Sequence, residues 1–571
     1  MPIWAPGAYS VTGYGRYVVN FKAFDKTGHD LAVKQVNENR WEIASGKSVQ
    51  KIEYDVLDSH KDTTSLYFAM ANIDTTLFFA NATALFGYFD DDKTASAQVN
   101  YELPTEWKLA CPLEPKAGYA PKVFSNTEFV AKNYDELADA PILSAPETGR
   151  NHSDYIVTAS FKEGKADYDV AVATDGTWSN AKMDSLTYYL REIVHAETDF
   201  FHDTPYKHYT FEIVAPTLSH MPSFAQGALE HANSSDYLLA DFGWSMFKGS
   251  FLSIFSHEFF HLWNVKRIHS NLLGPFNYTQ RVMTTSLWMA EGITEYYAHT
   301  LLARYGLISP EKFFSDVNQW REEMAMAPAS ANVKSLEDLS IDESTFEMDE
   351  ATLFYSRGPL VAMMLDIEIR SRTNNKKSLD DVMLAFNNET KHGKTFSEKE
   401  LIHKVEKYAG IDLTEFYNKY IHGTDSLPFD AYLEKMGLSR NMSDAMGANA
   451  PLPKLSFSIL GDSGIVFDAV DSSTAFAHAG IRAGDFVMAI NGTKFNRDNI
   501  MELSELLSPS GSRTGVTLSV LRGGAPVTIP VSFSSAHRKP AVPEENRLGS
   551  VEVAPNATPL SAVIRKGIVG Q

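Results

Sequence analysis

The chain has 571 residues, and at roughly 100 to 200 residues per domain this length predicts about three or four domains. Hydrophobic residues make up 44 % and charged residues 22 %, close to the globular average, which excludes disordered, collagen-like and coiled-coil classes. The 51 basic residues against 72 acidic ones leave a net charge of −21, and no basic stripe interrupts it, so we expect no nucleic-acid partner.

The amino terminus and the single cysteine set further limits. The opening residues, MPIWAPGAYS, lack the basic start and apolar core of a secretory signal, so we expect either a cytoplasmic protein or an exported one whose leader precedes this sequence. The most apolar stretch, residues 66–89, is interrupted by Asn72, Asp74 and Asn81, so we expect a soluble chain with no transmembrane segment. Cys111 is the only cysteine, which excludes an internal disulfide and a cysteine-based zinc site.

Residues 1–178 favour short strands. Runs of β-branched and aromatic residues, such as 17–21 and 155–159, alternate with turn residues such as 25–28 and 162–164. We therefore predict a β-rich N-terminal domain over residues 1–178.

Residues 179–450 are mostly helical in pattern. Apolar residues recur every three or four positions from Met183 to Ile193, which is typical of an amphipathic helix, and one strand is expected at residues 209–214. Ser397 is expected to cap the N-terminus of a later helix. Helical patterns cover residues 251–268, 360–369, 378–387 and 397–408.

The pattern returns to strands after Pro451 and Pro453. Strands are expected at residues 455–459 and 516–521, around one helix at 497–507, which makes a compact β-rich module over residues 451–536. Residues 537–571 are Pro-rich at first and are expected to form a tail. The order of these patterns predicts an α+β multidomain protein without internal repeats.

The motif that carries chemistry is His257-Glu258-Phe259-Phe260-His261. Two histidines four residues apart project from one helix face, so both imidazoles can reach one tetrahedral zinc at about 2.0 to 2.1 Å. Glu258 then lies beside the metal and can take a proton from a zinc-bound water, whose pKa the metal lowers to about 7. The alternative for this motif is a pair of core histidines.

A third ligand is expected from the next helix, WMAEGITEYY at residues 288–297. Glu291 and Glu295 share one face of that helix. One of them can ligate the metal while the other accepts the outer N–H of a ligating histidine. The apolar neighbours indicate that the helix is buried, and buried carboxylates require a metal or another cation. The spacing leaves open which of the two is the ligand.

Residues 257–268, HEFFHLWNVKRI, together with WMAEGITEYY resemble the glycyl aminopeptidase family of zinc metallopeptidases. This family shares a thermolysin-like catalytic domain with the larger aminopeptidase and leukotriene-hydrolase group. The resemblance begins at Met1 to Tyr9, continues through Gly227 to His231, and ends with a PDZ-like segment at Ala477 to Gly492. It implies a β-rich N-terminal domain, a mostly helical thermolysin-like domain over 179–450 and a PDZ-like domain over 451–536.

The resemblance also implies roles for individual residues in metal and amine binding. The glutamate before glycine, Glu291, is the zinc ligand, and Glu295 supports a ligating histidine. Gly227 and Ala228 lie in the strand segment that aligns the substrate backbone, and Glu230 binds the free α-amino group. A carboxylate one residue's length from the metal favours a cationic amine and leaves no room for further peptide.

The remaining role concerns the transition state. Phe354 to Pro359 resembles the segment that brings a tyrosine to the active site in the same relatives, and this makes Tyr355 the expected oxyanion stabiliser. By contrast, Lys266 and Arg267 follow the metal-binding helix and are expected only to complement its dipole. The other histidines considered, His220, His231 and His269, are expected in the core or at the surface.

These residues predict a zinc aminopeptidase with one zinc per chain, which removes small amino-terminal residues, glycine or alanine, from peptides with a free amino terminus. Two alternatives remain: a thermolysin-type endopeptidase, and a noncatalytic peptide-binding protein with a vestigial metal site. In the PDZ-like module, Gly461 to Phe467 is the nearest counterpart of a carboxylate-binding loop, and its acid would repel a carboxylate. The ligand of this module therefore stays open.

Overall fold

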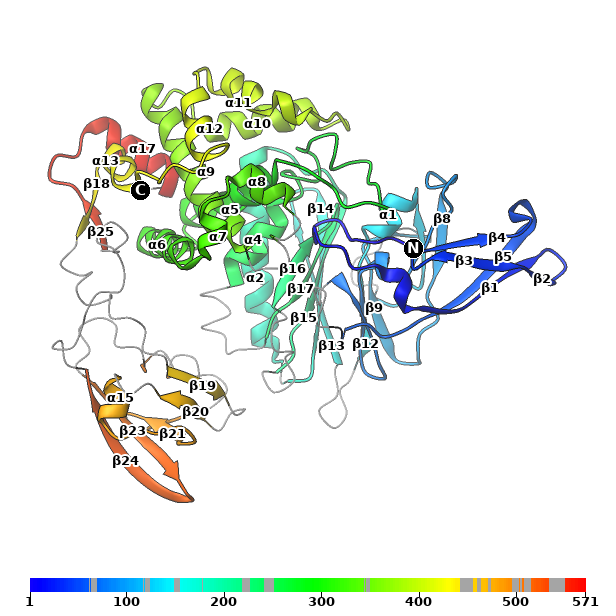
Figure 1. The fold of residues 1–571 in the computed structure, drawn as a ribbon, viewed down its shortest axis with the longest axis horizontal. Coiled ribbons are helices and arrows are strands. Elements are labelled where there is room, and N and C mark those ends of the chain that lie inside the picture. The colour runs from blue at the N-terminus through cyan, green and yellow to red at the C-terminus, as the bar shows by residue number, and fades with distance from the viewer. Residues whose placement is uncertain are drawn as a thin grey trace.

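The computed structural model of the chain describes most of its residues (Figure 1). The described part is the whole chain except residues 61, 63–68, 117, 119–123, 148–154, 177, 218–225, 241–250, 343–344, 346–349, 442–454, 460–463, 471–473, 496–502, 504–505, 508–514, 534–549 and 571. Strands dominate the first part, helices the middle and strands again the part near the C-terminus, which confirms the α+β multidomain prediction.

The first part of the chain folds into several small antiparallel sheets, with strand orders β2-β1-β5, β10-β11-β8, β6-β7-β12-β9 and β3-β4. Their apolar faces form two buried clusters, one around Tyr134 and Ile142 and one around Tyr14 and Met70. The elements are β1 (Val18–Asp25), β2 (Asp30–Leu31), β3 (Val33–Asn37), β4 (Arg40–Ile43), β5 (Val49–Val56), β6 (Ala71–Ile73), β7 (Phe78–Ala80), β8 (Ala97–Asn100), β9 (Trp107–Ala110), β10 (Glu114–Pro115), β11 (Glu128–Ala131), α1 (Tyr134–Ala138) and β12 (Ile142–Pro146).

A five-stranded mixed sheet supports the site, in the order β13-β14-β15-β17-β16. Its strands are β13 (Tyr155–Glu163), β14 (Ala166–Thr174), β15 (His208–Val214), β16 (Gly227–Glu230) and β17 (Ser234–Leu238). β15 confirms the strand expected at 209–214. The first two strands precede the expected domain boundary at residue 178, yet β14 pairs in parallel with β15. Hydrogen bonding thus joins residues 155–174 to the part of the chain that follows the boundary, not to the first sheets.

Helices pack on this sheet and on one another in the centre of Figure 1. α2 confirms the first amphipathic pattern, because Met183, Leu186, Leu190 and Ile193 are all buried. The helices are α2 (Asn180–Phe201), α4 (Leu252–Phe260), the π-helix η6 (Trp288–Ile293), α5 (Thr294–Arg304), α6 (Pro310–Met326), α7 (Ala329–Asn332), α8 (Leu336–Ile341), α9 (Thr352–Arg372), α10 (Leu379–Thr390), α11 (Leu401–Ala409), α12 (Thr414–Tyr420) and α13 (Phe429–Lys435).

Two of the helix predictions differ in detail from the structure. The motif helix was expected to reach residue 268, but α4 ends at Phe260 and turns follow, including Val265 in a positive-φ conformation at 152°. A β-branched residue cannot hold that conformation inside a helix. The pattern at 397–408 divides into the short 3-10 turn η8 (Glu398–Glu400) and α11, and Ser397 caps it reciprocally with Glu400 as expected.

The C-terminal part contains a second β-rich unit with its own core. Its elements are β19 (Leu455–Ile459), β20 (Ile465–Val470), α15 (Ala475–His478), β21 (Phe486–Ile490), β22 (Thr493–Lys494), β23 (Gly515–Arg522) and β24 (Ala525–Ser532). The expected Asn-Gly hairpin joins β21 to β22, with positive φ at both Asn491 and Gly492. The helix expected at 497–507 falls largely outside the described residues. Of the expected loop at 461–467, residues 461–463 lie outside them and residues 465–467 belong to β20.

The end of the chain differs from the expected tail. β25 (Ser550–Val553) pairs antiparallel with β18 (Leu438–Asn441), and α17 (Pro559–Val569) packs on α5 and α9, where it appears in red in Figure 1. Ile564, Ile568 and Val569 are buried in the main core. The apolar face of this last helix therefore packs into the core that the central helices share.

No helix within the described ranges combines the length and the apolar character needed to cross a bilayer.

Two glycines let η6 and α9 approach each other closely. A Cβ added at Gly292 in η6 would lie 2.7 Å from the Cα of Gly358 in α9, and one added at Gly358 would lie 2.8 Å from the Cα of Gly292. Glycine at both positions lets the two backbones touch. This contact fixes the position of Glu291, which precedes Gly292, against the helix that carries Tyr355.

We expect Gly292→Ala to lower the free energy of unfolding by at least about 2 kcal/mol, because backbone atoms cannot move aside for the new methyl group. Gly46→Ala is the matched control, since a Cβ there meets nothing within 4 Å. Its change should stay below about 1 kcal/mol. Chemical denaturation measures both values, and equal losses in the two variants would contradict the packing argument.

Candidate metal centre

The centre is built on α4 and the helix pair η6–α5. α4 is apolar on almost every side and is buried with its motif residues, His257 5 %, Glu258 7 % and His261 1 % exposed. Glu291 lies in η6 and is 3 % exposed. π-helical turns are rare in proteins, and those that occur are often found at functional sites. This one carries the glutamate that faces the two histidines.

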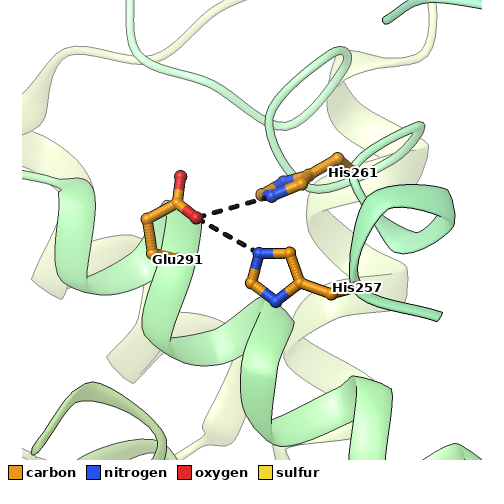
Figure 2. A group of neighbouring side chains, drawn as sticks. All are labelled: His257, His261 and Glu291. Carbon is orange, nitrogen blue, oxygen red and sulfur yellow. Dashed lines mark hydrogen bonds and ion pairs between the residues drawn. The ribbon is translucent and has the colours of Figure 1, made fainter. Parts of the chain in front are cut away.

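Three side chains converge on one point, as Figure 2 shows. The Oε2 atom of Glu291 lies 3.3 Å from Nε2 of His257 and 3.5 Å from Nε2 of His261. One ligand atom from each of the three residues lies within 4.8 Å of the others. The spacing of the sequence motif and the choice of Glu291 over Glu295 at this point therefore agree with the geometry.

The outer nitrogens of both histidines are occupied by acceptors. His257 Nδ1 lies 2.8 Å from Oε2 of Glu295, and His261 Nδ1 lies 2.7 Å from the carbonyl oxygen of Asn264. A carboxylate and a carbonyl can only accept, so each Nδ1 carries the proton that it donates. Nε2 is then the nitrogen that each imidazole presents to the centre, where its neutral form can ligate a metal.

This donor set fits a zinc ion. Two Nε2 lone pairs and a carboxylate oxygen at 3.3 to 3.5 Å repel one another unless a cation or a shared proton lies between them. Two imidazoles and one carboxylate form the ligand set of catalytic zinc sites, which keep a fourth position open. His257, His261 and Glu291 are therefore the residues that would hold the metal.

Glu258 lies beside this point and not in it. One of its carboxylate oxygens lies within 4.8 Å of ligand atoms from both Glu230 and His261. Burial raises the pKa of the Glu258 carboxyl to about 7, because its apolar surroundings disfavour the charge more than His257 and His261 favour it. A carboxyl that titrates near neutral pH next to the metal can both accept and return a proton.

Glu230 projects from β16, which pairs only with β17 among the described strands and so forms an edge of the sheet. Gly227 and Ala228 lie on the same strand, with Ala228 packed against the main core. Glu230 itself is 5 % exposed. An edge strand offers free backbone groups to an extended peptide, which agrees with the segment expected to align the substrate.

Lys266 was expected only to complement the dipole of the motif helix, but it lies beyond the end of α4. Because α4 ends early, the chain turns inward, and Lys266 Nζ lies 2.9 Å from Oδ1 of Asp139 and 3.7 Å from Oε1 of Glu230. His231 completes this network, with Nδ1 3.0 Å from Asp139 and Nε2 3.1 Å from Asp236. Burial raises the pKa of the Asp139 carboxyl, but Lys266 and His231 together outweigh it and lower that pKa to about 2.

The remaining residues considered from the sequence are Tyr355 and three histidines. Tyr355 lies in α9, is 39 % exposed, and its ring centre is 5.6 Å from that of His257. His231 is buried, as one of the expected alternatives had it. His269 hydrogen-bonds the carbonyl of Ser270. His220 lies outside the described residues.

A chain of buried groups continues behind His257 and was missed from the sequence. Glu295 Oε1 lies 3.2 Å from Nε2 of His299, and His299 Nδ1 lies 3.0 Å from Oδ2 of Asp316. Burial opposes a charge on His299, but Asp316 and Glu295 outweigh it and raise its pKa to about 9. The spacing of four residues between Glu295 and His299 was the available signal.

Tyr9 also reaches the centre. Its hydroxyl group donates a hydrogen bond of 2.8 Å to Oε1 of Glu291, from 282 positions away in the chain. No local pattern around Tyr9 indicates this contact.

Family models match three parts of the chain. The Peptidase M61 N-terminal domain matches residues 1–146, M61 glycyl aminopeptidase matches residues 250–361, and a PDZ domain matches residues 435–533. The second match contains the motif histidines, both glutamates of η6–α5 and Tyr355. No curated protein matches the chain.

Solved structures are similar to the chain as well. An aminopeptidase N family protein from Idiomarina loihiensis is 22 % identical with a TM-score of 0.72, over 100 % of this chain and 94 % of that one. An M1 zinc metallopeptidase from Deinococcus radiodurans is 13 % identical with a TM-score of 0.44, over 72 % of this chain and 87 % of that one. The first likeness shows the fold.

We expect Glu295→Ala to weaken zinc binding about 10- to 100-fold, because His257 loses the acceptor that orients its ring. Competition with a chromogenic chelator measures the zinc dissociation constant. Glu415→Ala is the control, since this glutamate is 83 % exposed in its side chain and pairs only at the surface with Lys419. Zinc affinity equal to that of the unchanged protein in both variants would show that Glu295 does not orient a ligand.

Proposed function

We propose that this chain, a metallo-aminopeptidase whose residues 1–146 and 250–361 match the M61 family models, uses one zinc ion to remove amino-terminal glycine or alanine from peptides. The observation that carries the proposal is the position of Glu230. Its carboxylate is buried on an edge strand, within 4.8 Å of ligand atoms of Glu258 and His261. The substrate amine and the scissile carbonyl can therefore be held at the same time by groups a few ångströms apart.

This short separation supports exopeptidase action. The amine and the carbonyl of one residue are joined through a single Cα, so a carboxylate at this distance from the metal ligands accommodates one residue and no more. The buried carboxylate also selects the charged terminal amine over an uncharged amide nitrogen. An endopeptidase would need room for further peptide where Glu230 lies.

The chain's own residues divide the chemical work. A zinc ion held by His257, His261 and Glu291 would polarise the scissile carbonyl and lower the pKa of a water molecule. Glu258 takes a proton from the attacking water and returns it to the leaving amine. Tyr355, whose ring centre lies 5.6 Å from that of His257, donates a hydrogen bond to the oxygen that becomes negative in the transition state, an effect of about 3 kcal/mol in comparable sites.

We expect Glu258→Gln to lower kcat on a glycyl chromogenic amide at least about 10²- to 10⁴-fold, since the amide cannot accept the proton. Zinc content should stay at one ion per chain, because Glu258 is not a ligand. Metal analysis alongside kinetics separates the two effects. Unchanged kcat in the zinc-loaded variant would exclude Glu258 as the base, and absence of hydrolysis of any free-amine substrate by the unchanged protein would favour the noncatalytic alternative.

We expect Glu230→Gln to raise KM for glycyl peptides more than it lowers kcat, because a charge-assisted contact worth about 1.5 to 3 kcal/mol is lost. Acetylation of the substrate's amino group should abolish cleavage by the unchanged enzyme. Hydrolysis of acetylated peptides at internal bonds would instead support the thermolysin-type endopeptidase.

A further inference from the structure

The first residues of the chain reach the centre from the N-terminal part. The dark blue segment in Figure 1 runs from the N-terminus toward the middle of the molecule. Two hydrogen bonds anchor it to the loop before η6: Ile3 N donates to the carbonyl of Tyr278 at 2.9 Å, and Trp4 Nε1 donates to that of Asn277 at 2.8 Å. Ala5 and Ala8 are buried against Leu229 of β16. The segment is therefore fixed to both sides of the site.

Tyr9 decides which oxygen of Glu291 faces the metal position. Its hydroxyl donates to Oε1 at 2.8 Å, while Oε2 is the atom that faces both Nε2 atoms. With Oε1 engaged in this way, Glu291 presents a single ligand atom. A second coordinated oxygen would take the position that a catalytic zinc keeps open for water or substrate.

The backbone conformation of Tyr9 is unusual. Its φ is +52°, in the left-handed region that a bulky side chain seldom adopts. Such conformations persist where the surrounding structure over-determines them, and they concentrate at active sites. Here the conformation turns the phenol from the anchored segment toward Glu291.

Gly7 is in contact with the other end of the site. A Cβ added there would lie 2.5 Å from Oε2 of Glu230 and 3.0 Å from Cδ2 of Leu229, and its φ is +89°. Only glycine allows the backbone to pass so close. Lys266 lies near Oε1 of the same carboxylate, so Glu230 is held between Gly7 and Lys266.

We propose that Gly7 to Tyr9 form a wall of the active site, in which Tyr9 restricts Glu291 to one ligand atom and its ring limits the substrate's first residue to a small one. The second part rests on the proposed function. The first residue must extend from Glu230, which Gly7 touches, to the metal position beside Glu291, which the Tyr9 hydroxyl touches. Residues 7 to 9 span the same interval, because Gly7 lies against Glu230 and the Tyr9 hydroxyl bonds Glu291. A side chain on the substrate Cα that is directed to this segment would therefore meet Tyr9.

Three variants separate the hydroxyl from the ring. Tyr9→Phe removes the hydrogen bond and keeps the wall, and Tyr9→Ala removes both. Tyr14→Phe is the control, because it removes a buried hydroxyl in the same part of the chain that donates to the Ala69 carbonyl. Zinc dissociation constants are measured by chelator competition, and kcat/KM is measured on glycyl and leucyl amides. Thermal unfolding of all three variants monitors folding.

Tyr9→Phe should weaken zinc binding about 10- to 100-fold and leave the preference for glycyl over leucyl amide unchanged. Tyr9→Ala should weaken zinc binding similarly and reduce that preference at least about 10-fold. Tyr14→Phe should change neither. Unaltered zinc affinity in Tyr9→Phe overturns the positioning role, and an unaltered preference in Tyr9→Ala overturns the wall.

Gly7→Ala tests the amine end, with Gly28→Ala as its control, since Gly28 has a φ of +82° and nothing within 4 Å of a Cβ. Both variants strain the backbone equally, but only Gly7→Ala should raise KM for glycyl amide. A rise in both variants, or in neither, counts against the wall. If the unchanged protein hydrolyses no free-amine substrate, the proposed function fails, while the zinc affinities of the Tyr9 variants still decide the positioning role.

Discussion

Three hydrogen-bond acceptors share one buried point in this protein, and the arrangement around them follows from that constraint. Two imidazole nitrogens and a carboxylate oxygen at 3.3 to 3.5 Å repel one another unless a cation or a shared proton lies between them. The neighbouring groups keep the acceptors aimed inward: Glu295 and Asn264 accept the outer imidazole protons, and Tyr9 occupies the other carboxylate oxygen. Each of these contacts therefore directs one ligand atom to the same point.

The fold brings these groups together from three separate parts of the chain. α4 supplies His257, and its C-cap residue is His261. The contact between Gly292 and Gly358 holds Glu291 and the Tyr355 helix against each other. The edge strand β16 supplies Glu230, the carboxylate proposed to bind the substrate amine. Asp139 and Tyr9 come from the N-terminal part, where the first fixes Lys266 beside Glu230 and the second contacts Glu291. The N-terminal part therefore contributes to the site as well as covering it.

Local patterns were sufficient for the centre of the site but not for its surroundings. Side chains four residues apart on one helix share a face in any fold, so the histidine pair and the two glutamates could be predicted from spacing. Lys266 was misjudged because the motif helix was expected to continue to residue 268. The positive φ of Val265, which is incompatible with a helix, could not be read from the sequence. Asp139 and Tyr9 lie 127 and 282 residues from their partners. The predicted boundary at residue 178 and the predicted tail likewise missed two long-range contacts. These are the pairing of β14 with β15 and the packing of α17 on α5 and α9.

The most direct test of the central claim is a crystal of the zinc-loaded protein, measured on both sides of the zinc absorption edge. The account predicts one anomalous peak per chain, about 2.0 to 2.2 Å from His257 Nε2, His261 Nε2 and one oxygen of Glu291, with Glu258 outside ligand distance. A peak elsewhere in the molecule, or histidine side chains turned away from a common point in the loaded crystal, would contradict it.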